Sequence, residues 1–132
     1  MTELNAASDR MVLIIDSKVK DTEGFKTWAR DRAAKYVYEL KEENSISYEW
    51  HISADGREAT LIEAFTDSDA MMVRVGNHAA SPLASEVLEL IDKTDVLCLG
   101  NAKPNAVETL SAWGARFRSH HSGYNREIVA PR

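Results

Sequence analysis

The chain contains 132 residues, of which 44% are hydrophobic and 28% charged, with a formal net charge of −5. This length and composition are typical of one globular domain, so we expect a single domain over residues 1–132, with a core from 11 to about 119 and a loosely held tail over 120–132. The negative charge argues against nucleic acid and acidic membrane surfaces as partners, and no apolar run approaches the roughly 18 residues of a membrane span.

Hydrophobic patterning divides the chain into short strands and amphipathic helices. The sequences MVLIIDSKVK and DVLCLGN are apolar on both faces, which is typical of strands buried on two sides. Apolar residues at three- and four-residue spacings predict helices after the caps Asp21 and Thr66, and Ser81-Pro82 restarts the second helix. In chain order, the patterns predict a strand over 11–20, a helix from 22 to about 44, strands over 47–52 and 58–66, a helix from 67 that restarts at 82, a strand over 95–101, a helix over 104–113 and, at most, an edge strand over 115–119.

The register of the central hairpin can be predicted from its turn. Asp55-Gly56 is a strong signal for a two-residue turn between antiparallel strands. Counting back from this turn sets Trp50 opposite Leu61 and Tyr48 opposite Glu63. Glu63 is therefore expected on the same face of the sheet as two large aromatic side chains.

A carboxylate among apolar side chains has two interpretations. Glu63 would share its face with Tyr48, Trp50 and Phe65, where it is costly unless it is hydrogen-bonded or protonated. It is either a general acid or base with a pKa raised by burial, or a structural partner of Tyr48 or of an arginine at a dimer interface. The residues leave both interpretations open.

The order of the elements predicts an α+β fold of the ferredoxin-like, split βαβ type with a four-stranded antiparallel sheet. Right-handed crossovers place both main helices on the same face of this sheet, so the other face stays bare within one subunit. Because the strands over 11–20 and 95–101 are apolar on both faces, we expect a second copy of the chain to cover the bare face in a homodimer.

The segment EAFTDSDAMMVRVGNHAASP, residues 63–82, resembles the antibiotic biosynthesis monooxygenase superfamily. These dimeric α/β barrel proteins include quinol monooxygenases, anthrone-type oxygenases and haem-degrading branches. The sequence YEW ahead of an Asp-Gly turn is also similar to one branch of the superfamily, and the order of elements agrees over residues 11 to about 119. The resemblance implies the dimeric α/β barrel fold.

The resemblance also implies a function. It indicates a monooxygenase that needs no cofactor and acts on a phenolic or quinol-like aromatic small molecule, because such a substrate can pass an electron to dioxygen once it is deprotonated. Two alternatives stay open, a non-catalytic dimer that binds or senses a small molecule and a haem-binding relative. In the haem-degrading branch the position of the iron-binding histidine corresponds to Leu88, and leucine cannot ligate iron, so haem ligation is not expected at this position.

Such a site needs aromatic walls, a base for the substrate hydroxyl and polar groups that stabilise a developing anion. Members of the superfamily carry a helix histidine whose position here is either Arg74 or His78. The expected catalytic residues are His78, Glu63, Trp50 and Asn77, and the expected substrate-binding residues are Tyr48, Arg74, Phe65, Trp28, Met72 and His51.

The four histidines and the single cysteine do not form a recognisable metal or nucleophile motif. His51 and Glu49 share a strand face without a third ligand fixed by spacing, so no metal site is expected. Cys98 lies in an apolar strand and is expected to be a core residue. With one cysteine and a polar stretch over residues 1–10, the sequence fits a reducing, cytoplasmic location.

Overall fold

The computed structural model describes residues 3–126 of the chain, so residues 127–132 of the expected tail lie outside the described residues. The elements run in the order β1 (Met11–Val19), α1 (Thr22–Thr27), the π-helical segment η1 (Trp28–Ala33), α2 (Ala34–Glu39), β2 (Ser45–Ile52), β3 (Glu58–Phe65), α3 (Ser68–Ala80), α4 (Leu83–Leu88), β4 (Ile91–Leu99), α5 (Pro104–Ser111) and β5 (Arg116–Arg118).

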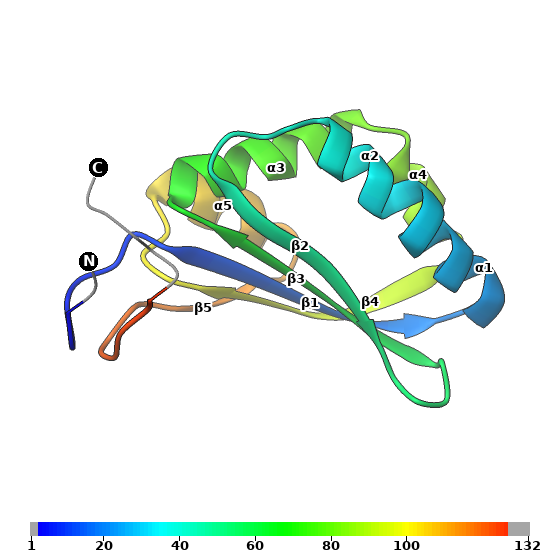
Figure 1. Ribbon diagram of the computed structural model, residues 1–132, viewed down its shortest axis with the longest axis horizontal. Helices are drawn as coiled ribbons and strands as arrows, with labels where there is room; N and C mark the ends of the chain where they lie inside the picture. The colour runs from blue at the N-terminus through cyan, green and yellow to red at the C-terminus, as the bar shows by residue number, and fades with distance from the viewer. Residues whose placement is uncertain (1–2, 127–132) are drawn as a thin grey trace.

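The described strands form one mixed sheet, and the helices pack on one of its faces (Figure 1). The strand order is β2-β3-β1-β4-β5, and the first four strands pair antiparallel as the ferredoxin-like prediction requires. The described sheet has five strands instead of the predicted four, because β5 adds to β4 in parallel. Arg116 anchors this extra strand with a bidentate ion pair to Asp95, at 3.1 and 2.8 Å.

The predicted hairpin register is confirmed. Tyr48 lies opposite Glu63 and Trp50 lies opposite Leu61. The turn closes through the Gly56 N–H, which donates to the Ser53 carbonyl oxygen at 2.9 Å. Gly56 has a φ of 75°, a left-handed conformation that glycine adopts without strain.

The first helix is continuous from Thr22 to Glu39 but contains a π-helical segment in its middle. Its buried residues Phe25, Ala29, Ala33 and Val37 follow one another in steps of four. On an α-helix of 3.6 residues a turn, each such step drifts by about 40°. The wider turn of the π-segment offsets this drift and keeps all four side chains on the core face.

Three predicted boundaries were wrong by a few residues. The first helix ends at Glu39 and not near Asn44, because Lys41 and Asn44 adopt positive φ values of 50° and 65°. The N-cap of α3 is Asp67 and not Thr66, since the Asp67 carboxylate accepts from the Ala70 N–H at 2.8 Å. β4 begins at Ile91, four residues ahead of the predicted start.

The two faces of the sheet have different neighbours. Met11, Leu13 and Ile15 of β1 face the helices and are buried in the core. Val12 and Ile14 point to the opposite face and are only half-buried. Tyr48 and Trp50 pack on the helix side, so the helices of the same subunit cover the aromatic face of β2. Among the described helices, none is long and apolar enough to cross a membrane.

Candidate functional site

An open cleft lies between the helices and the sheet, and its lining is mostly apolar and aromatic. Three tryptophans, Trp28, Trp50 and Trp113, come from η1, β2 and the turn after α5. Aliphatic side chains of β1, β3, β4, α2, α3 and α4 complete the walls. The cleft therefore suits an apolar or aromatic small molecule.

Aromatic packing holds the tryptophan wall in place. The Trp50 ring lies edge-on to Phe25 and Trp28, with centroid separations of 5.1 and 6.1 Å. The Trp50 indole N–H donates to the Tyr48 hydroxyl oxygen at 2.8 Å. Both polar atoms come from the same strand face, two residues apart, because side chains alternate along β2.

Glu63 is the buried carboxyl of the cleft. Its side chain projects from β3 opposite Tyr48, and the residue is 6% exposed. Burial raises the pKa of Glu63 to about 7; the positive charge of Arg74 opposes this rise and the negative charge of Glu42 adds to it. No side chain among residues 3–126 hydrogen-bonds to this carboxyl. It can therefore bind or release a proton near neutral pH.

Tyr48 lies next to this carboxyl and keeps its proton. Burial raises the pKa of Tyr48 far above its usual value, although the hydrogen bond from Trp50 acts in the opposite direction. Within the described part of the chain, the Tyr48 O–H finds no acceptor. The cleft thus presents a hydroxyl donor beside a carboxyl that can accept a proton.

Arg74 forms a buried ion pair behind the carboxyl. Its guanidinium Nη1 lies 3.2 Å from Oε1 of Glu42, in the loop between α2 and β2. Oε2 of Glu42 accepts from the Asn77 side-chain amide at 2.8 Å. Both charged side chains are almost fully buried. The charge of Arg74 is therefore largely balanced by Glu42 and not by Glu63.

His78 and Lys93 also line the cleft, and His78 is half-buried whereas Lys93 is exposed. Burial lowers the pKa of His78, and the charges of Arg74 and Lys93 lower it further. His78 is thus neutral near pH 7 and can accept a proton or a hydrogen bond. The Lys93 ammonium lies 4.9 Å from the centre of the Trp113 ring, a cation–π contact.

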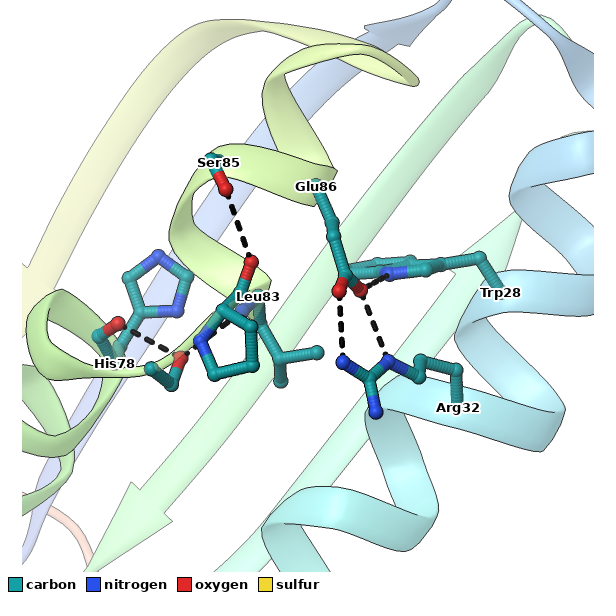
Figure 2. Close-up of polar contacts among 8 residues, drawn as sticks. Trp28, Arg32, His78, Leu83, Ser85 and Glu86 are labelled. Carbon is teal, nitrogen blue, oxygen red and sulfur yellow. Dashed lines mark hydrogen bonds and ion pairs between the residues drawn. The ribbon is translucent and has the colours of Figure 1, made fainter.

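Figure 2 shows a contact between the first helix and α4, two elements that contribute to the lining of the cleft. The Glu86 carboxylate accepts from the Trp28 indole N–H at 2.9 Å and from Arg32 at 3.0 and 2.7 Å. The hydrogen bond from Arg32, and to a smaller extent that from Trp28, lowers the pKa of Glu86 to about 2. On the same side, the Ser81 hydroxyl donates to the His78 carbonyl oxygen at 2.8 Å and ends α3.

The structure brings six of the expected site residues to the cleft, namely Trp28, Tyr48, Trp50, Glu63, Arg74 and His78. The other four lie elsewhere. His51 projects from the opposite face of the sheet, where it is exposed beside Glu49, because it neighbours Trp50 in an alternating strand. Phe65 is fully buried in the core, and Met72 packs against the same core cluster. Asn77 bonds Glu42 and lies outside the lining of the cleft.

Sequence reasoning missed several residues of the site. Glu42 and Glu86 meet partners 32 to 58 positions away in the chain, so no local pattern marks them. Trp113 and Lys93 line the cleft from elements whose orientation only the tertiary fold decides. Among the described residues there is no group of three or more histidine, cysteine, aspartate or glutamate side chains that could hold a metal ion.

Comparisons with known proteins agree with the fold. The comparison with family models and the comparison with curated protein sequences found no match to the chain. The crystal structure of MupZ from Pseudomonas fluorescens is similar with a TM-score of 0.74 at 14% identity, and the match covers 96% of both chains. Protein SO0527 from Shewanella oneidensis is similar with a TM-score of 0.52 at 22% identity, over 74% of this chain and 94% of that one. At these identities the likeness shows a shared α+β fold.

Proposed function

We propose that the cleft is the active site of an enzyme that uses Glu63 as a general base on an apolar aromatic small molecule. The observation that supports this is a buried carboxyl at the wall of a cleft lined by tryptophans, without a hydrogen-bond partner in the described chain. Burial raises the pKa of this carboxyl to about 7. General bases work best when their pKa lies near the working pH. A purely structural carboxylate would instead be expected to be hydrogen-bonded.

The reaction that we favour is oxygenation of a phenolic or quinol-like substrate without a cofactor, as the family resemblance implies. Glu63 would take a proton from the bound aromatic, and the resulting anion would pass electrons to dioxygen. For anthrone, the CH₂ carbon becomes a carbonyl, the second oxygen atom leaves as water, and all four electrons come from the substrate. Tyr48 would donate its O–H to the oxygen on which the negative charge develops.

Oxygen uptake with anthrone tests this proposal. We expect saturable oxygen consumption above the spontaneous rate, and we expect His78→Ala to lower it about tenfold or more, because the neutral His78 imidazole lines the cleft and would accept a hydrogen bond from the bound substrate. His51→Ala is the matched control, since His51 lies on the opposite face of the sheet, and it should leave the rate unchanged. Oxygen uptake would be measured with an electrode.

A second measurement separates catalysis from binding. Quenching of tryptophan fluorescence by anthrone reports occupancy of the cleft, because three tryptophans line it. Quenching without oxygen uptake would contradict the oxygenase and favour a non-catalytic dimer that binds a small molecule. Equal rates in the two histidine variants would contradict the assignment of this cleft.

We also infer that the chain is a homodimer through the face of the sheet that its helices leave bare. The apolar side chains on this face, Val12, Ile14, Ile62, Leu97 and Leu99, are only half-buried within one subunit. A contiguous apolar surface across three adjacent strands is unusual for a monomer and typical of a subunit interface. A second copy would bury it sheet against sheet.

Sedimentation velocity tests the dimer. We expect the wild-type protein to sediment at twice the subunit mass, and Ile14→Lys to sediment as a monomer because it places a charge at the centre of the interface. Val73→Lys is the matched control, since Val73 is an exposed apolar residue of α3 on the helix side. Monomeric wild-type protein at micromolar concentration, or equal dissociation by both variants, would contradict this interface.

A further inference from the structure

Glu42 stands out because it is a buried charge that lies neither in a helix nor in a strand. Its side chain is 4% exposed and that of its partner Arg74 is 3% exposed, although Glu42 belongs to the connection between α2 and β2. Connections usually run over the surface, where a glutamate stays in water. The burial of this carboxylate therefore needs a local cause.

The backbone of the connection directs Glu42 inward. Lys41, one residue before Glu42, and Asn44, two residues after it, have positive φ values of 50° and 65°. This conformation is rare for residues other than glycine and is found where the surrounding structure imposes it, often at functional sites. The Asn44 carbonyl oxygen accepts from the Thr66 N–H at 3.0 Å, which fixes the connection to the end of β3.

The pairing of Glu42 with Arg74 is incomplete in a specific way. An arginine and a carboxylate commonly form two parallel hydrogen bonds. Here Oε1 of Glu42 meets Nη1 of Arg74 at 3.2 Å, whereas Oε2 is occupied by the Asn77 amide at 2.8 Å. Nη2 of Arg74 is buried without a hydrogen-bond partner among residues 3–126. A buried pair of this kind is weak support for stability, so a functional reason is worth testing.

Arg74 also interacts electrostatically with the Glu63 carboxyl, because its positive charge lowers the pKa of that group. The titratable and charged groups that face it or share its cleft are Tyr48 from β2, Arg74 and His78 from α3, Lys93 from β4 and Glu42 from the connection. Tyr48 and His78 are neutral near pH 7, and Lys93 lies at the exposed mouth over Trp113. Arg74 is thus the buried cation that could pair with Glu63 if its present partner were lost.

We propose that Glu42, held by Asn77, is a positioning residue that keeps the Arg74 guanidinium in its own ion pair and away from the Glu63 carboxyl. Without Glu42, the unpaired guanidinium would turn its free nitrogen toward Glu63 and fix that group as a carboxylate. The consequence for catalysis rests on the proposed function of Glu63 as a base. The electrostatic effect itself does not depend on any reaction.

Carbon-13 NMR of protein labelled at its glutamate carboxyls measures the effect directly. The Glu63 signal is identified by its loss in Glu63→Gln, and its titration is followed in wild type and in Glu42→Gln. We expect Glu42→Gln to lower the midpoint by about one to three pH units, because an opposite charge then lies next to Glu63 without compensation. Glu43→Gln is the matched control, since Glu43 is the exposed neighbour in the same connection, and it should not shift the midpoint.

Two further variants guard against a failure to fold. Glu42→Asp keeps the charge but withdraws it by one methylene, and it should lower the midpoint in the same direction by a smaller amount. Glu42→Gln with Arg74→Gln removes both charges and should restore the wild-type midpoint or raise it. An unchanged midpoint in Glu42→Gln, or an equal shift in Glu43→Gln, would overturn the inference. The titration of Glu63 is measured without substrate, so a protein without oxygenase activity could still show the expected shift of the midpoint.

Discussion

Glu63→Gln is expected to lower kcat/KM for anthrone by about 10²–10⁴, the usual contribution of a general base. Glutamine has the same shape as the protonated acid but cannot take up a proton. In the wild type, the rate should rise with pH up to about 7, where the Glu63 carboxyl loses its proton, and then level off. Initial rates over a pH series would measure both effects.

The control for this variant lies on the other face of the sheet. Glu49→Gln changes an exposed glutamate of β2, which pairs only with His51 among the described residues. We expect it to keep the wild-type rate and pH profile. A loss of activity equal to that of Glu63→Gln, or an unchanged rate in Glu63→Gln, would mean that Glu63 is not the base.

Glu63→Gln should also make the protein more stable than the wild type at alkaline pH. Below about pH 4.5 the Glu63 carboxyl is protonated in both the folded and the unfolded chain. Between pH 4.5 and about 7 only the folded chain holds the proton, so the free energy of unfolding of the wild type falls as pH rises through this window. The total fall is about 3 kcal/mol, at 1.36 kcal/mol for each unit of pKa shift. Glu63→Gln lacks this fall.

Urea unfolding of both proteins at about pH 4.5 and about pH 8.5 measures the difference. The subtraction of wild type from variant cancels His78, whose lowered pKa gives stability that rises with pH in both proteins. We expect the variant to gain about 3 kcal/mol relative to the wild type between the two conditions. An equal difference at both pH values would mean that Glu63 titrates as it does in an unfolded chain.

Local chemistry explains why the sheet could be predicted from the sequence. The Asp55-Gly56 turn and the two-residue period of strands are properties of neighbouring residues, and together they set Tyr48 opposite Glu63. The same period shows why His51 could not join Trp50 in the cleft, since adjacent residues of a strand face opposite sides. That signal was present in the sequence.

Other features depend on contacts between distant segments. Both faces of β1 are apolar in the sequence, so the sequence does not reveal which face of the sheet the helices cover. The packed structure shows that they cover the face that carries Tyr48 and Trp50. The π-segment over Trp28–Ala33 changes the phase of the first helix, and no local sequence pattern predicted it. The pair Glu42–Arg74 spans 32 positions and depends on two positive φ values that no turn motif announces. Long-range pairing of this kind requires coordinates.

Arg74→Met is expected to lower the free energy of unfolding by about 3–5 kcal/mol near pH 8. Methionine fills a similar volume but leaves the Glu42 carboxylate buried without its cation. The cost arises from the stranded charge and not from the lost attraction, because burial of both charges already offsets much of the pair's Coulomb energy. Urea unfolding would measure the loss.

Two companion variants identify the cause of this loss. Arg74→Met with Glu42→Gln removes both charges, and we expect it to recover most of the stability, since the glutamine still accepts from Asn77. Arg30→Met removes an arginine of the first helix whose pair with Asp31 is exposed, and it should cost less than about 1 kcal/mol. If the double variant were as unstable as Arg74→Met, the loss would come from packing of the guanidinium. Recovery in the double variant would instead mean that the fold does not need the Glu42–Arg74 ion pair. A role in setting the charge of Glu63 would then explain why the chain contains this pair.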